Sequence, residues 1–216
     1  MAQYNLHCFS QSGNSYKVAL YLACTRLDWE PVFVDFFRGA TRDSKWRESV
    51  NEMGEVPVLE DDDGRRTTQS GVILTMLAER HGRYGGKDDD ERREVLRWLF
   101  FDNHKFTSYF ATWRFMKAFA PTAPDPTLAT WLRGRIDNAF GIVDKHLAGR
   151  DFIVGDAFTI ADISLSGYLF FPADESGVVL EERFPRMAAW RDRLRTMPGW
   201  GDPYEVLPGE RVAPCW

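Results

Sequence analysis

The sequence of 216 residues predicts two parts of different class, a mixed α/β part followed by an all-helical part. Strand-like and helix-like segments alternate up to residue 81, which is typical of a sheet flanked by helices. After residue 90 the strand patterns stop, and long amphipathic segments follow, as in a helical bundle. The glycine-rich, charged stretch GRYGGKDD separates the two parts. We therefore predict an N-terminal domain over 1–81, a linker over 82–89 and a helical domain over 90–216.

The N-terminal elements are predicted from hydrophobic spacing and from turn residues. A strand, an amphipathic helix and a second strand come first, and this order favours a parallel βαβ unit. The Asp63-Gly64 dipeptide then indicates a hairpin, and Ser70 and Gly82 are placed to cap the helix that follows it. Strands are expected at 3–9, 30–36, 56–60 and 65–69, and helices at 12–27, 45–53 and 70–82.

The helical part is predicted from apolar residues at helical spacing. Residues 91–119 form either one long helix or a broken pair, and further helices are expected at 127–149, 159–171 and 184–197. Within FTIAD, Thr159 and Asp162 have the spacing of a capping box, and Phe158 is placed to pack on Ile163. This signature indicates a role in folding.

Composition argues against several classes of partner. The formal net charge is −5 and the pI about 5.4, so we expect no nucleic-acid partner. The sequence shows no secretory leader and no apolar run of the ~20 residues that a membrane span needs, so we expect no membrane partner and a cytoplasmic location. Cys8, Cys24 and Cys215 are odd in number and widely spaced, which argues against a disulfide framework. We expect no metal, because the four histidines lack ligand spacing and the acidic runs 61–63 and 88–90 suit a solvated turn and a helix N-terminus.

A proline inside a predicted strand carries the strongest functional signal. Pro57 lies in GEVPVL, although a proline cannot donate a ladder hydrogen bond. The segment NEMGEVPVLEDDDGRRTTQSGVI is similar to the N-P-x-G-x-V-P-x-L…[EQ]-S-x-x-I segment of the cytosolic glutathione transferases. DFIVGDAFTIADISL is similar to their G-x-x-[ST]-x-A-D segment, and FPRMAAWRDRLRTMPG resembles their usual last helix. The resemblance covers almost the whole chain and implies a thioredoxin-like N-terminal domain, an all-helical second domain and glutathione as co-substrate.

The resemblance also implies where glutathione binds. It implies a cis bond between Val56 and Pro57, so that the Val56 backbone pairs with the cysteinyl part of glutathione like an added strand. Gln69 and Ser70 are expected to bind the γ-glutamyl carboxylate, because a helix N-terminus offers free N–H groups.

Glu55 departs from the family pattern. The resembled proteins carry Gln, Lys or Arg at this place, where it helps to hold the glycyl carboxylate, and an acid would repel that group. Arg42, or alternatively Lys45, is expected to hold the glycyl carboxylate instead.

Activation of the thiol is expected at the start of the first helix. A cysteine thiol has a pKa near ~8.5, and only the thiolate is a good nucleophile. Ser12 matches the serine of the phi, tau and zeta classes, and also the threonine of the bacterial T-P-N-G-x-K pattern of the nu-like group, whose asparagine Asn14 matches. We expect both side chains to donate to the sulfur; which one dominates, and which class applies, stays open, and a plain capping role is the alternative. Cys8 is expected to be buried in the first strand, so no mixed disulfide with glutathione is expected.

The acceptor site is expected on the aromatic segment FDNHKFTSYFATWRF. The resemblance implies an acceptor site lined by the first helix of the second domain, and Tyr109, Phe110 and Trp113 are expected to include its contacts, with core packing as the alternative. The predicted function is that of a homodimeric transferase that binds glutathione, stabilises its thiolate and adds it to a small hydrophobic electrophile. Glutathione-dependent reduction of disulfides or peroxides is a second enzymatic possibility. A non-catalytic binding or regulatory role, which Glu55 favours, is the alternative from another class.

Overall fold

The computed structural model describes residues 2–216, which fall into two compact units. Unit 1 holds the residues up to Arg83 and the later segment Pro198–Arg211, and unit 2 holds Tyr84–Met197 and Val212–Trp216. Unit 1 is a mixed α/β structure and unit 2 is all-helical, so the predicted fold class is confirmed. The segment Pro198–Arg211 differs from the prediction, which places it in the helical domain.

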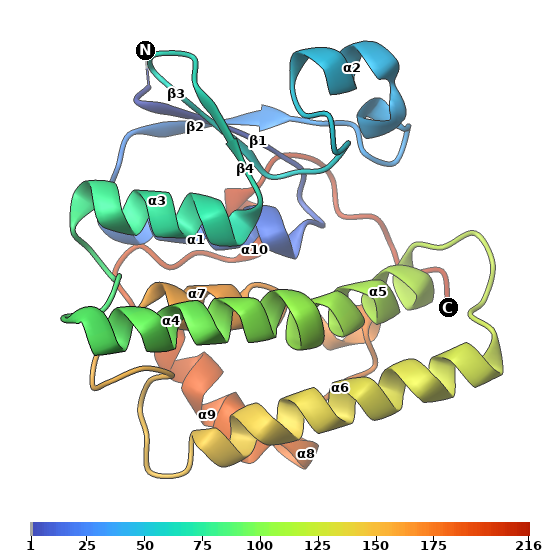
Figure 1. Cartoon of the computed structure of the whole chain (residues 1–216). Coiled ribbons are helices and arrows are strands. Elements are labelled where there is room, and N and C mark those ends of the chain that lie inside the picture. Colours follow the sequence, from blue (N-terminus) through green and yellow to red (C-terminus); the bar gives the residue numbers. More distant parts are fainter. Residues whose placement is uncertain (1) are drawn as a thin grey trace. The chain divides into compact units, whose positions relative to one another are not determined.

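Unit 1 is built on a four-stranded sheet with the strand order β2-β1-β3-β4 (Figure 1). Strands β1 and β2 are parallel, whereas β1 pairs antiparallel with β3, and β3 antiparallel with β4. The register sets His7 opposite Val58, and Val58 opposite Thr68. The strands are β1 (Tyr4–Cys8), β2 (Trp29–Phe33), β3 (Val58–Asp61) and β4 (Arg66–Thr68).

Helices α1 (Gly13–Thr25) and α3 (Ser70–His81) lie together on one face of this sheet (Figure 1). The Tyr21 hydroxyl of α1 donates a hydrogen bond to the Leu77 carbonyl of α3 at 3.1 Å. Nearly every residue of α1 is buried, so its apolar residues are not confined to one stripe. The shorter helices of unit 1 are η1 (Ala40–Arg42), α2 (Ser44–Ser49) and α10 (Pro203–Val206).

The C-terminal segment Pro198–Arg211 packs on α1. The Tyr16 hydroxyl donates to the Gly201 carbonyl at 2.7 Å, and Leu207 is buried. Gly199 has φ +87°, and a Cβ there would collide with the Ala23 carbonyl of α1. Glycine is therefore needed at this close approach.

Unit 2 begins with one helical run that changes its hydrogen-bond spacing in the middle. The run consists of α4 (Asp89–Phe101), the π-helical turn η2 (Asp102–Phe106) and α5 (Thr107–Ala118). The Thr107 N–H donates to the Asp102 carbonyl five residues earlier. The buried Asp102 carboxylate accepts from the Thr107 and Ser164 hydroxyls at 2.5 Å each. The structure thus contains a single run with a π-bulge rather than a broken pair.

The other helices of unit 2 pack around this run. Figure 1 shows α6 beside α5 and α7 beside α4, and α9 packs on α6. The predicted capping box is present, because the Thr159 N–H donates to the Asp162 carboxylate at 2.9 Å while the Thr159 hydroxyl accepts from the first turn of α7. These helices are α6 (Pro126–His146), α7 (Ile160–Ser166), η3 (Ala173–Glu175), α8 (Leu180–Arg183) and α9 (Pro185–Leu194). Over residues 2–216, none of the helices has both the length and the apolar character that crossing a membrane requires.

Candidate active site at one end of the sheet

Three segments of unit 1 meet the sheet at the same end. Strands β1 and β4 end there and β3 begins there, because His7 lies opposite Val58 and Val58 opposite Thr68. The loop to α1, the turn before β3 and the loop to α3 are therefore neighbours. A hydrogen bond of 3.0 Å from the Gln69 side-chain amide to the Glu55 carboxylate links the last two.

Ser12 is the N-cap of α1, and its side chain is almost fully buried. Its Oγ accepts hydrogen bonds from the Ser15 backbone N–H at 3.1 Å and from the Ser15 hydroxyl at 2.9 Å. A hydroxyl that accepts two bonds still has one proton to donate, and the bond from Ser15 polarises that proton. Ser12 can therefore cap the helix and donate to a sulfur with the same atom.

Asn14 and Cys8 lie near Ser12 in the chain, and they differ in whether their side chains are available to contact a ligand. Asn14 lies in the first turn of α1, half-buried, and its amide has no partner within the part of the chain that the structure describes. Cys8 is buried in β1, as predicted, and burial raises the pKa of its thiol to about 12, so it stays protonated.

The turn before β3 presents an open backbone edge. The Val56–Pro57 bond is cis, as the resemblance implies. No partner among residues 2–216 is found for the Val56 N–H or carbonyl. Asn51 supports the turn, because its amide donates to the Glu55 carbonyl at 2.8 Å and its oxygen accepts from the Met53 N–H at 3.1 Å.

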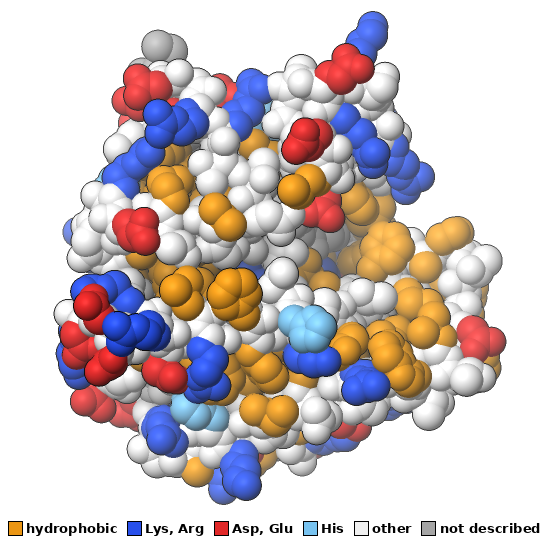
Figure 2. Space-filling model, in the orientation of Figure 1, with side chains coloured by type: hydrophobic (Ala, Val, Ile, Leu, Met, Phe, Trp, Pro, Cys, Tyr) orange, Lys and Arg blue, Asp and Glu red, His pale blue; other side chains and the backbone are white. Residues whose placement is uncertain are grey.

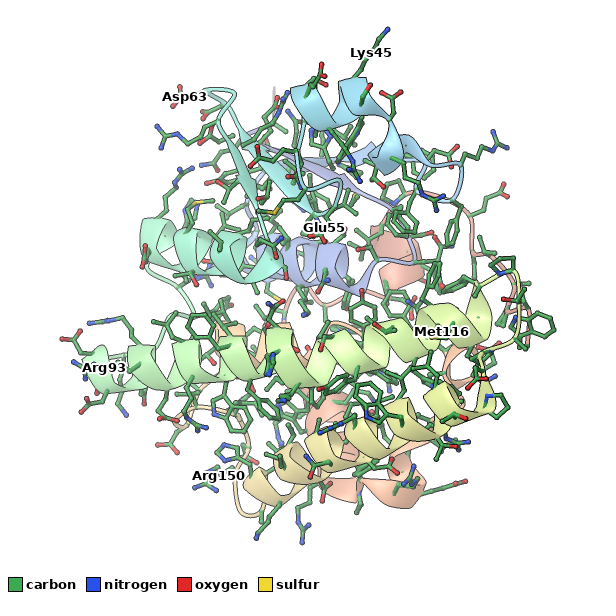
Figure 3. All side chains as sticks on the ribbon, turned by 45° about the vertical axis from the view of Figure 1, so that its right-hand side comes forward. Lys45, Glu55, Asp63, Arg93, Met116 and Arg150 are labelled. Atoms are coloured by element: carbon green, nitrogen blue, oxygen red, sulfur yellow. The ribbon has the colours of Figure 1, made fainter. Side chains whose placement is uncertain are left out.

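Arg47 packs against the same turn. Gly54 has φ +68°, and a Cβ there would lie 2.6 Å from the Arg47 guanidinium and 2.7 Å from the Thr41 carbonyl, to which Arg47 Nε donates. Arg42, predicted to hold the glycyl carboxylate, is exposed and has no ion pair within the described chain. Its predicted alternative, Lys45, points away from the unit in Figure 3.

Helix α3 begins at Ser70 itself, so the prediction of Ser70 as the N-cap is wrong. The N-cap is Gln69, with φ +65°, and no side chain caps the helix. Gln69 thus has a rarely populated backbone conformation. Ser70, the next residue, is already the first residue of the helix and of its first turn. The N–H groups of that turn and the Ser70 hydroxyl stay open to an anion. Strain of this kind amounts to about 1–3 kcal/mol and is commonly found at functional sites.

The loop that carries Ser12 is tied to the C-terminal segment. The Gln11 amide donates to the Glu210 carbonyl at 2.7 Å, and the Ser10 hydroxyl lies 3.3 Å from the same carbonyl. The Ser10 hydroxyl also donates to Gln11 Oε1 at 2.9 Å. Sequence reasoning missed this contact, because its acceptor is a backbone carbonyl 199 residues away and leaves no side-chain pattern.

Two of the three aromatic residues predicted for the acceptor site lie in the core of unit 2. The Phe110 ring packs edge-on against Phe140 with centroids 5.0 Å apart. The Trp113 indole N–H donates to the Ser176 carbonyl at 2.7 Å. Both side chains are buried, whereas Tyr109 is half-exposed.

Tyr109 borders an apolar surface of unit 2. Its ring meets Trp131 edge-on with centroids 5.6 Å apart. Figure 2 shows apolar side chains gathered over α5 and the beginning of α6, where Phe115, Leu128 and Trp131 are exposed. Of the three predicted aromatics, Tyr109 is thus the one open to a ligand.

The acidic run at the β3–β4 turn, labelled at Asp63 in Figure 3, belongs to the hairpin. Its three carboxylates lie within 4.8 Å of one another, and Asp62 and Asp63 are exposed. Asp61 accepts from the Arg65 N–H at 2.9 Å and from the Arg80 guanidinium at 3.4 Å. These bonds tie Asp61 to the hairpin and to α3, and the exposed Asp62 and Asp63 form the tip of the turn.

Both units match known protein families. The family described as glutathione S-transferase, N-terminal domain, matches residues 11–80, and the family described as glutathione S-transferase, C-terminal domain, matches residues 104–198. A crystal structure of a glutathione S-transferase from Pseudomonas fluorescens Pf-5 is 30% identical and has a TM-score of 0.85 over 94% of this chain and 99% of that one. Glutathione S-transferase F14 of Arabidopsis thaliana is 28% identical over 90% of this chain and 80% of its own length. Ure2p in complex with glutathione, 22% identical, shares the fold with a TM-score of 0.83 over 95% of this chain and 98% of its own. The chain belongs to the glutathione S-transferase family.

Proposed function

We propose that this protein binds glutathione at the end of the sheet where β1 and β4 end and β3 begins, and transfers it to a small hydrophobic electrophile. The observation that carries the proposal is the meeting of three complementary groups in unit 1. The Val56 backbone edge suits the cysteinyl part, the uncapped first turn of α3 at Ser70 suits the γ-glutamyl carboxylate, and the Ser12 hydroxyl suits the sulfur. The names of the relatives support it, since they are glutathione S-transferases and Ure2p is solved with glutathione.

Each residue has a stated task in this proposal. Gln69 and Ser70 hold the γ-glutamyl end, and an arginine of the segment before the turn, Arg42 or Arg47, holds the glycyl carboxylate. Ser12 donates to the thiolate, helped by the Asn14 amide. A hydrogen bond to a charged group is worth about 1.5–3 kcal/mol, which lowers the thiol pKa by about one to two units.

The transfer step is a nucleophilic attack by sulfur. The thiol releases its proton to solvent, and the thiolate forms a bond to an electrophilic carbon. In a substitution the leaving group departs with its bonding electron pair, and in an addition the product carbanion takes up a proton. Tyr109 contacts the electrophile, and Phe110 and Trp113 support its helix from the core.

We place the protein in the cytoplasm as a homodimer. Its three cysteines are free, two of them buried, which suits a compartment that keeps glutathione reduced. Membership of the family supports the homodimer, and Phe100 on α4 is an exposed apolar side chain for the partner subunit to cover.

The test is an ultraviolet titration of the thiolate of bound glutathione in wild type and in the Ser12→Ala variant. We expect Ser12→Ala to raise the thiol pKa by about one to two units, and to lower the rate with an aryl halide at neutral pH by about tenfold to a hundredfold. The glutathione dissociation constant should change little, because the hydroxyl contacts one atom of a tripeptide. Ser12→Thr keeps a hydroxyl and should restore the low pKa.

The same assay separates the alternatives. Absence of glutathione binding by wild type would refute the proposal. A bound thiolate that reduces a disulfide or peroxide but does not react with aryl halides would assign the reductase function. A bound thiolate with neither activity would assign a binding or regulatory role.

A further inference from the structure

Glu55 places an unpaired negative charge at a site proposed for an anionic ligand. Its carboxylate is exposed, and no ion pair to it exists among residues 2–216. Arg47, which packs against Gly54, does not pair with it. Glutathione carries two carboxylates but also one α-ammonium, so an acid in the site has one attractive partner on the ligand.

The Glu55 side chain turns toward the start of α3 (Figure 3). Its Oε2 accepts from Gln69 Nε2 at 3.0 Å, and the same amide lies 3.3 Å from the Met53 sulfur. A carboxylate can only accept, so Gln69 must present its NH2 group to Glu55, which leaves Gln69 Oε1 as a further acceptor. The Glu55 carboxylate and Gln69 Oε1 are therefore two neighbouring acceptors beside the turn before β3.

Donors adjoin these acceptors directly. Ser70 follows Gln69 and opens α3, whose first-turn N–H groups are uncapped. A pair of acceptors beside a set of N–H donors is complementary to an ammonium and a carboxylate on one carbon. That is the chemistry of a free α-amino acid end.

We infer that Glu55 selects for the α-ammonium of the γ-glutamyl residue, which Glu55 and Gln69 bind while the first turn of α3 binds the α-carboxylate. The inference rests on the proposed function, and it makes Glu55 a specificity-determining residue for the ammonium group of the thiol. Thiols that lack the ammonium, or carry it acylated, are discriminated against. Glu55 then faces away from the glycyl carboxylate and does not repel it.

The test is calorimetric binding of two thiols by wild type and by Glu55→Gln. The first thiol is glutathione, and the second is glutaryl-cysteinyl-glycine, which lacks only the α-amino group. We expect Glu55→Gln to weaken glutathione binding by about tenfold, the effect of losing one charge-assisted hydrogen bond. Binding of the deamino thiol, already about tenfold weaker in wild type, should not change. Glu52→Gln is the matched control, since it removes an exposed acid of the same loop that has no described contact with Gln69.

The outcomes separate this inference from the function on which it rests. Wild type that binds glutathione, with a Glu55→Gln variant that binds it equally well or more tightly, would overturn the inference alone. An equal loss for both thiols would also overturn it, because it would indicate a general change in the turn. Wild type that binds neither thiol would overturn the proposed function as well.

Discussion

Asp162 satisfies four hydrogen-bond donors with one buried carboxylate. Besides its capping-box partner, the Thr159 N–H, it accepts from the Thr159 hydroxyl at 3.1 Å, from the Ile153 N–H at 2.9 Å and from the Trp190 indole at 2.9 Å. Burial raises the pKa of Asp162 from 3.8 to about 6, and the four donors oppose that rise. The folded protein therefore holds a proton that the unfolded chain releases between these two values. The contribution of this proton to stability is complete below pH 3.8 and is lost as the pH rises through about 6.

We expect this loss in wild type to appear when its stability is compared with that of Asp162→Asn at several pH values. The free energy of unfolding of wild type minus that of the variant should fall by about 2 kcal/mol between pH 4 and pH 6.5, and change little above. Urea unfolding followed by tryptophan fluorescence measures both values. Glutathione affinity of the folded variant at pH 7 should be normal, because Asp162 belongs to unit 2 and its bonds hold a helix start. A difference that grows with pH would show that the donors outweigh burial.

The sequence placed Ser12, whereas features that depend on the folded backbone were not predicted. Ser12 could be placed by counting back from Lys17 and Val18 and matching the resembled proteins, and the structure shows it as the N-cap of α1, while its donation to a sulfur stays a prediction. The N-cap at Gln69 could not be placed in this way, because it depends on the φ of +65° that Gln69 adopts after β4. The packing of Arg47 against the turn before β3 was not predicted, because it depends on Gly54, where φ is +68° and a Cβ would lie 2.6 Å from the Arg47 guanidinium.

At the scale of elements, the C-terminal segment 198–211 is the part of unit 1 that hydrophobic periodicity does not predict. Its contacts to α1 and to the Ser12 loop use backbone carbonyls, at Gly201 and Glu210. Any residue type can offer a carbonyl, so the sequence carries no mark of them. The strands and long helices, in contrast, were predicted within a few residues, because burial of a face requires an apolar period.

We expect Gly199→Ala to detach this segment from α1. The new Cβ would meet the Ala23 carbonyl, and the residue has φ +87°, so the free energy of unfolding should fall by about 3 kcal/mol. Limited proteolysis should then cut within 198–211, and thermal melting should give the loss of stability. Gly64→Ala is the control, since Gly64 has φ +77° with nothing within 4 Å of its Cβ position. It should lose only about 1 kcal/mol, and an equal loss in both variants would contradict the role given to the close approach.

At the scale of the whole molecule, the proposed dimer predicts a particle of twice 24.9 kDa. Phe100 on α4 is 73% exposed, the highest value among the exposed large apolar side chains of the described residues, so it offers apolar surface for a partner to bury. Light scattering at micromolar concentration should give the dimer mass for wild type, and Phe100→Asp should shift it toward the monomer. Leu128→Asp, at an exposed leucine of α6, should leave the mass unchanged. A wild-type mass of 24.9 kDa would refute the homodimer.

The route of the C-terminal segment also bears on the order in which the chain folds during synthesis. Domains of a nascent chain usually fold in the order in which they emerge, the N-terminal one first. Here unit 1 includes residues 198–211, which follow residues 84–197 of unit 2 in the chain. Unit 1 therefore cannot complete its contacts until those residues of unit 2 have been synthesised. The loop that carries Ser12 gains its tether to Glu210 only after the helices α4 to α9 have been made.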